Sequence, residues 1–151
     1  MDKPPLESRW LATLSIAIDP PTAVGPDLLL INVVEARLDG PRIKAKVIPP
    51  SGDWVRVQPG GNWNLDVRLA FLTDDGEAIF CKYSGVLRMD PGLGERLAAG
   101  ESVPGSEIYL RAAPCFETRS DKYAWLNDML AVGKITGFGG GKVSYDIYEI
   151  L

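Results

Sequence analysis

The sequence predicts an all-β domain that closes into an antiparallel β-barrel of about seven strands, with one short helix near the C-terminus. Segments in which apolar and polar residues alternate recur along the 151 residues, and clusters of Gly, Pro and Asp separate them. So many strands would leave exposed edges in an open sheet, whereas a closed barrel removes the edges and encloses a pocket. A β-sandwich is the alternative architecture.

The N-terminal half contains three predicted strands. Residues 10–18 alternate between apolar and smaller side chains, as in a strand with one buried face. A second apolar run covers residues 28–38, turns at residues 39–41 and returns through residues 43–48, which is typical of a hairpin. Proline cannot donate to a strand ladder, so the Pro-Pro-Ser-Gly segment at residues 49–52 is expected to end the pairing.

The clearest hairpin lies in the middle of the chain. Residues 65–72 and 77–87 alternate, and the Thr-Asp-Asp-Gly segment at residues 73–76 joins them. Asp-Gly between two alternating runs is a strong hairpin signal. Further strands are predicted at residues 108–116 and 142–150, and the whole chain is expected to form one domain.

The predicted helix lies between these last two strands. Ser120 is suited to cap its N-terminus, and Tyr123, Leu126 and Leu130 share one stripe at helical spacing. Gly133 is suited to end it.

Two glycine-rich segments have other expected roles. Residues 88–107 are rich in Gly and Pro and are interpreted as either a flexible lid or a disordered excursion, with space for one or two helical turns. Residues 137–142 look like a phosphate cradle, but Thr136 replaces the first glycine of a P-loop and a strand follows. We interpret that segment as a flexible turn.

Composition and charge exclude several classes of partner. Acidic side chains outnumber basic ones by 20 to 16, which disfavours nucleic acid. No apolar stretch is long enough to span a bilayer, and the N-terminus does not resemble a secretory signal. Cys81 and Cys115 are too few for a disulfide framework, so a cytoplasmic location is expected.

The chain contains no histidine, so it lacks the commonest general base and the commonest metal ligand. Any catalysis must therefore come from carboxylates, Tyr, Lys, Arg, Cys or backbone groups. We expect no metal and no cofactor. Without a histidine to lower its pKa, Cys81 is expected to be an inert core thiol.

Strand periodicity places a polar group on one face of the central hairpin. Asp66 and Arg68 share a face, and any even-numbered turn at residues 73–76 puts Tyr83 on that face too. An odd loop length would separate them. The face either lines the barrel interior or carries an exposed ion pair of little energetic consequence.

Other candidate residues occur at the ends of strands or within them. Arg111 lies in the middle of a predicted strand, where a planar guanidinium suits a carboxylate on a neighbouring strand or an anionic substrate. Glu117 follows at the end of that strand. Trp54 and Trp63 lie near glycines at strand edges, where they either stack on a ligand or plug the barrel end.

Five short motifs are spread over most of the chain. They are Leu-Asp-Val-Arg at residues 65–68, Thr-Asp-Asp-Gly at 73–76, Tyr-Ser-Gly at 83–85, Phe-Glu-Thr at 116–118 and Tyr-Ala-Trp-Leu-Asn at 123–127. Together they resemble the DUF3237 (UPF0311) family. The resemblance implies a small barrel, related in shape to calycin or allene-oxide-cyclase-like barrels, with a central cavity.

The resemblance also implies which polar residues are shared with the family. These are Asp53, Asp66, Arg68, Tyr83, Arg111, Glu117, Tyr123, Trp125 and Asn127. Val33, Val34 and Glu35 stand where the family often carries glycines, and Asp27 stands near an expected arginine. These differences would narrow one side of the cavity or change its charge.

The function we expect is that of a cofactor-free lyase or isomerase acting on an aromatic or polyketide-like molecule. Asp53 or Asp66 would be the general base, and Tyr83 would donate to a developing oxyanion. Substrate contacts are expected from Arg68, Arg111, Glu117, Trp54, Trp63, Tyr123, Trp125 and Asn127. The alternatives are a non-catalytic carrier or sensor, and a structural or partner-binding barrel filled by side chains. A homodimer is the default assembly.

Overall fold

The computed structural model describes residues 1–151 and shows a closed antiparallel barrel of eight strands. In barrel order the strands are β1 (Ser8–Ile18), β10 (Lys142–Ile150), β9 (Ala131–Gly139), β8 (Leu110–Glu117), β6 (Ala78–Leu87), β5 (Trp63–Thr73), β4 (Lys44–Val57) and β3 (Leu28–Asp39). Pairing of β1 with β3 closes the barrel. The predicted fold class, an all-β closed barrel, is therefore confirmed.

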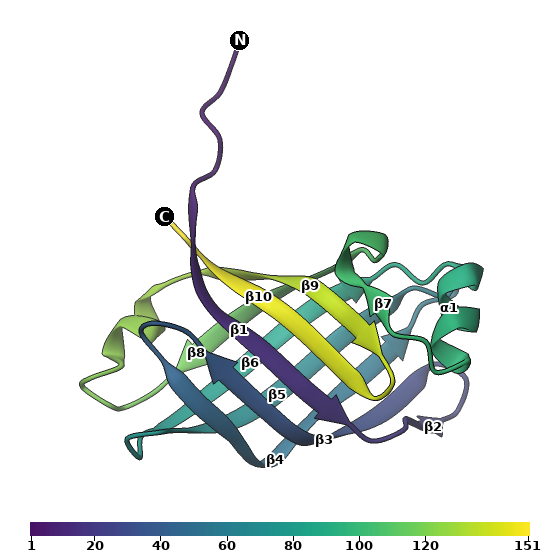
Figure 1. The fold of residues 1–151 in the computed structure, drawn as a ribbon, viewed down its shortest axis with the longest axis horizontal. Coiled ribbons are helices and arrows are strands. Elements are labelled where there is room, and N and C mark those ends of the chain that lie inside the picture. Colours follow the sequence, from purple (N-terminus) through teal and green to yellow (C-terminus); the bar gives the residue numbers. More distant parts are fainter.

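Short helices and strands lie at the two ends of the barrel (Figure 1). Strand β2 (Thr22–Val24) pairs with β3, and β7 (Val103–Pro104) pairs with β9. Helix α1 (Pro91–Ala98) lies at one end, and the 3₁₀ helix η2 (Ala124–Asp128) lies at the other. No helix has the length and apolar character needed to cross a membrane.

Residues 88–107, expected to be a lid or a disordered excursion, fold into α1, β7 and the 3₁₀ helix η1 (Gly105–Glu107). Asp90 caps α1, because its Oδ1 accepts a hydrogen bond from the backbone N–H of Leu93 at 2.6 Å. Leu93 is buried and anchors the helix to the barrel. A lid role for this segment stays a prediction.

The helix predicted from Ser120 to Gly133 is wrong in extent. Only η2 forms there, and β9 begins at Ala131. Gly133 lies within β9 opposite Ala112, and a Cβ at Gly133 would already be 3.4 Å from the Ala112 Cβ. Glycine at this position thus allows close strand packing, and it does not end a helix. The turn predicted at residues 137–142 is shorter than expected: Gly140 and Gly141 join β9 to β10 with positive φ angles of 64° and 76°, whereas residues 137–139 belong to β9.

The expectation that residues 49–52 end strand pairing is confirmed only in part, because residues 49–51 have no partner on β3 or β5 but pairing resumes at Gly52. Strand β4 continues through the segment, and its register to β5 shifts by two residues between Ile48 and Gly52. The Ser51 hydroxyl replaces lost ladder bonds: Oγ donates to the Ile48 carbonyl and accepts from the Ala70 N–H, each at 2.9 Å. Proline is tolerated at such a bulge because no ladder N–H is needed from it.

Apolar side chains fill most of the barrel interior. Thirty-two buried residues form one cluster, and β5 shows the pattern that builds it. Its Leu65, Val67, Leu69 and Phe71 are buried, whereas the residues between them are at least partly exposed. Toward the η2 end, Phe71 and Leu38 are almost completely buried. Two of the free spaces, described below, lie toward the end that carries α1.

Candidate active site

The turn of the central hairpin decides which side chains face inward. It contains three residues, 74–76, because the Thr73 N–H donates to the Glu77 carbonyl at 2.8 Å, and Gly76 has a φ of 91°. This odd loop pairs Val67 with Tyr83. Tyr83 therefore faces the interior, while Asp66 and Arg68 face outward. The prediction that these three residues share a face is wrong.

Asp66 and Arg68 form a cluster on the outer surface with Trp54. The Arg68 Nη2 lies 3.5 Å from the Asp66 Oδ2, and the side chains are 52% and 43% exposed. The Arg68 guanidinium also lies 5.6 Å from the centre of the Trp54 ring. An exposed pair of this kind contributes little stability. The cluster is separated from the interior by the sheet itself.

The interior contains a small chamber whose walls are almost entirely apolar. Its free volume is about 30 Å³, which is space for one water-sized group. The lining residues are Ile16, Ile18, Ile31, Val33, Asp53, Trp63, Leu65, Val67, Tyr83, Leu110, Phe138, Val143 and Tyr145. Val33, which we expected to narrow the cavity, is part of this wall. Asp53 is the only ionisable carboxyl group in the chamber.

The Asp53 side chain points into the chamber because Asp53 follows the β4 bulge and lies two residues before Val55, which is buried. Alternate residues of a strand face the same side of the sheet. Burial raises the pKa of the Asp53 carboxyl from 3.8 to about 7. The backbone N–H of Asp66, 3.2 Å from the Asp53 Oδ1, opposes this rise, and the Asp66 carboxylate adds to it. Asp53 thus exchanges its proton near neutral pH, where a general base is most effective.

Two tyrosines face Asp53 across the chamber. Burial raises the pKa of Tyr83 well above 10, and Tyr145 and the Asp53 carboxylate raise it further. Burial likewise raises the pKa of Tyr145. The two rings meet edge to face with centres 5.8 Å apart. Both phenols therefore stay protonated at neutral pH and can donate hydrogen bonds to a developing negative charge.

A wider mouth opens next to the chamber at the α1 end. Its free volume is about 480 Å³. The residues that line the mouth but not the chamber are Asp19, Pro20, Pro21, Met89, Gly94, Leu97, Ala98, Gly139, Gly140 and Gly141. Ile18, Ile31, Trp63 and Phe138 line both spaces. The Trp63 and Phe138 rings meet edge to face with centres 6.5 Å apart and lie where the mouth adjoins the chamber.

The predicted residues at 123–127 lie at the opposite end of the barrel, in and beside η2 (light green in Figure 1). The Tyr123 hydroxyl donates to Asp75 Oδ1 at 2.8 Å. The Asn127 side chain accepts from the Thr118 N–H and donates to the Thr118 carbonyl, each at 2.9 Å. The Cζ atom of the Arg42 guanidinium lies 3.7 Å from the centre of the Trp125 ring. These contacts fasten the β8–β9 connection to neighbouring turns.

Arg111 and Glu117 lie on the outer face of β8. The Arg111 Nη1 donates to the Leu110 carbonyl at 2.9 Å, and its guanidinium lies 4.7 Å from the Tyr109 ring centre. The Arg88 guanidinium lies 3.8 Å from the same ring. The structure does not bring Arg111 or Glu117 to Asp53.

Sequence reasoning missed two aromatic residues of the site. Tyr145 follows the alternation of Val143 and Ile147 in the last strand, and that pattern could have assigned it to the interior. Phe138 was not assigned to the interior, because it lies between glycines that we interpreted as part of a turn. Of the residues we selected, the structure brings together Asp53, Tyr83 and Trp63.

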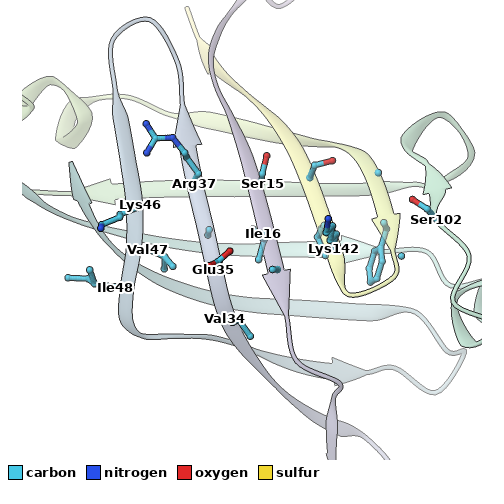
Figure 2. A pocket seen from close by; sticks show the side chains of 17 residues that line it. Ser15, Ile16, Val34, Glu35, Arg37, Lys46, Val47, Ile48, Ser102 and Lys142 are labelled. Carbon is cyan, nitrogen blue, oxygen red and sulfur yellow. The ribbon is translucent and has the colours of Figure 1, made fainter. Parts of the chain in front are cut away.

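A larger and more open hollow in the barrel wall is shown in Figure 2. It is lined by residues of β1, β3, β4, β9 and β10, has a free volume of about 890 Å³, and shares Ile16, Phe138 and Val143 with the chamber. Arg37, Lys46 and Lys142 contribute positive charge and Glu35 contributes negative charge. These charged side chains are exposed. The chamber at Asp53 is the better candidate site, because it combines burial with a strongly shifted acid.

The closed barrel, with its apolar mouth and buried acid, fits a small-molecule-binding barrel. The family described as "Protein of unknown function (DUF3237)" matches residues 6–150, and the chain belongs to that family. A UPF0311 protein of Clostridium acetobutylicum is 31% identical over 125 residues, which are 80% of this chain and 79% of that protein. The resemblance stated from the motifs is confirmed.

Solved structures share the whole fold. The crystal structure of the conserved protein of unknown function RPA1785 from Rhodopseudomonas palustris has a TM-score of 0.92 and 29% identity, and covers 99% of this chain and 100% of its own. The crystal structure of an enzyme from Penicillium herquei has a TM-score of 0.70 and 18% identity, and covers 100% of this chain and 98% of its own. At that identity the likeness to the Penicillium enzyme is one of fold alone.

Proposed function

We propose that this protein is a cofactor-independent lyase or isomerase that transfers protons on a small aromatic or polyketide-like molecule held at the barrel mouth. One observation carries the proposal. Asp53, whose pKa is raised to about 7 by burial, lies at the floor of an apolar funnel together with two protonated tyrosines. A base of matched pKa next to neutral hydrogen-bond donors is the arrangement that enolising enzymes use.

The proposed reaction begins when the Asp53 carboxylate removes a proton from the carbon next to a carbonyl group. The electron pair of that C–H bond moves onto the carbonyl oxygen, and the Tyr83 hydroxyl donates a hydrogen bond to the resulting enolate. In an isomerisation, Asp53 returns the proton to a different carbon. In an elimination, the electron pair expels a leaving group from the neighbouring carbon. Asp66, proposed from the sequence as an alternative base, lies on the outer face, and its carboxylate does not line the chamber.

The fold is compatible with catalysis of small-molecule reactions. The Penicillium herquei protein that shares it is described as an enzyme. That description supports an enzymatic use of this type of barrel, and the assignment for this chain depends on Asp53.

A carrier or sensor is the second candidate, and the size of the chamber favours it. The chamber holds only a water-sized group, whereas the mouth has a volume of about 480 Å³. A carrier needs only the mouth, so its ligand would bind equally well with or without the Asp53 carboxylate, and it would catalyse no reaction. In an acid–base enzyme, loss of the Asp53 carboxylate would lower the reaction rate, while substrate binding would persist.

Deuterium exchange tests the enzyme proposal without knowledge of the natural substrate. The probe is 2-acetonaphthone, a flat aryl methyl ketone, whose methyl protons exchange with D₂O when a base removes them. NMR follows the loss of the methyl signal. We expect the wild-type protein to accelerate exchange and Asp53→Asn to reduce the acceleration by about 100-fold or more.

Two further variants sharpen the exchange test. Tyr83→Phe should slow exchange by about 10-fold or more, because it removes an enolate donor. Glu117→Gln removes a carboxylate on the outer face of β8, away from Asp53, and should exchange at the wild-type rate. The proposal fails if the wild-type protein does not accelerate exchange, or if Asp53→Asn exchanges as fast as the wild type.

A further inference from the structure

We infer that the mouth beneath α1 selects an uncharged, flat molecule and holds its body, so that only the small reacting end of the molecule reaches Asp53. This inference rests on the proposed function and adds the substrate class. It concerns the ten residues that line the mouth alone and the four that line both the mouth and the chamber.

Charge is the first argument. No Lys or Arg lines the mouth or the chamber, and the only charged side chains are Asp19 and Asp53. The Asp19 Oδ2 accepts a hydrogen bond from the Asn32 Nδ2 at 2.9 Å, which holds this carboxylate at the rim. An anionic substrate would approach two carboxyl groups with no compensating cation. Arg111, which we expected to anchor an acidic group, lies on the outside of the barrel.

A cationic substrate is also disfavoured, because the walls of the site are apolar. Pro20, Pro21, Met89 and Leu97 form much of the mouth, and Ile31 lies at its floor. An ammonium group would lose its hydration there, and the single buried carboxyl offers too few acceptors to replace it. An uncharged molecule loses little on entry and gains from apolar burial.

Size is the second argument. A volume of about 480 Å³ suits a molecule of two or three rings, whereas about 30 Å³ suits a single carbonyl or hydroxyl group. The Trp63 and Phe138 rings lie between the two spaces. The body of the substrate therefore stays on the mouth side of these rings, and only its small reacting end extends past them toward Asp53.

Helix α1 supplies the side of the mouth that the body would contact. Gly94 and Ala98, small residues one turn apart, line the space. A Cβ at Gly94 would meet only the Met89 Sδ, at an ordinary distance of 3.9 Å. A side chain can therefore begin at Gly94 without a clash at its Cβ, and a large one is expected to occupy part of the mouth. Glu95 is exposed and does not line the mouth, so it provides a matched control on the same helix.

The test compares three probes of nearly equal shape: 2-acetonaphthone, 2-naphthoate and 2-naphthylmethylammonium. Their dissociation constants are measured by NMR titration at pH 7.5. We expect the neutral ketone to bind about 10-fold or more tightly than either ion. Gly94→Phe should weaken ketone binding by about 10-fold or more, and Glu95→Phe should leave it within about 2-fold of the wild type. Ala98→Phe repeats the obstruction if Gly94→Phe does not fold.

Three results overturn the inference: either ion binds as tightly as the ketone, a folded obstructing variant binds the ketone normally, or no probe binds. The inference and the proposed function can fail separately. If Asp53→Asn abolishes exchange but Gly94→Phe binds the ketone normally, the mouth assignment is wrong and the enzyme proposal stands. If Gly94→Phe blocks binding but Asp53→Asn exchanges normally, the mouth assignment stands and the enzyme proposal is wrong.

Discussion

Replacing Asp53 with asparagine should stabilise the folded protein above pH 7 and have little effect near pH 4. Burial raises the pKa of this carboxyl from 3.8 to about 7, so the folded state holds the proton more tightly than the unfolded chain does. Its contribution to stability is complete below about pH 4 and is lost as the pH rises to about 7. At about 1.36 kcal/mol per pKa unit, the loss is at most about 4 kcal/mol. Asparagine keeps the shape and an oxygen that can accept the Asp66 N–H bond.

Urea unfolding at several values between about pH 4 and pH 8 measures this effect as the difference in unfolding free energy between Asp53→Asn and wild type. Carboxyl groups with lowered pKa values, such as Asp39 and Asp74, change the stability of both proteins alike and cancel in the difference. Asp66→Asn controls for the loss of one negative charge on the neighbouring strand. A difference that stays constant over this pH range would refute the reasoning from burial.

Three further substitutions test the structural contacts by urea unfolding at pH 7. Ser51→Ala should cost about 1–3 kcal/mol, because it leaves the Ala70 N–H without its acceptor at the β4 bulge; an unchanged midpoint would contradict this. Asn127→Ala should cost about 2 kcal/mol, since it removes both hydrogen bonds to the Thr118 backbone; Asn127→Asp, which keeps one acceptor, should cost less. Arg68→Ala should change stability by less than about 0.5 kcal/mol, because its ion pair is exposed, and a larger loss would give the outer cluster a structural role.

The sequence predicted the barrel because period-two alternation is a local property, visible in each strand by itself. The inward residues of β5, Leu65 to Phe71, follow it without exception. Strand register depends on the loop instead. The loop between Thr73 and Glu77 has three residues, an odd number, and this places Tyr83 on the opposite face from Asp66. The Asp-Gly signal is compatible with both odd and even loop lengths.

Strand β9 was missed for a different reason. Its glycines lower intrinsic strand propensity, and the apolar spacing that precedes it, from Tyr123 to Leu130, matches the helical period. Only the partner strands β8 and β10 show why Gly133 belongs in a sheet. Asp53 was selected through the family resemblance, and its isolation among apolar walls became visible only when strands distant in sequence were assembled around it.

Two of the five family motifs lie at the closed end of the barrel, whereas two others contribute Leu65 and Tyr83 to the chamber. Phe-Glu-Thr and Tyr-Ala-Trp-Leu-Asn close one end by bonds such as that between Tyr123 and Asp75, whereas the open end consists of Pro20, Met89, Leu97 and their neighbours. A relative recognised by these two motifs alone is therefore matched by the contacts that close its barrel. Two such proteins can have the same contacts at the closed end and bind different molecules. A ligand known for one should therefore be assigned to the other only after the residues that line the two mouths have been compared position by position.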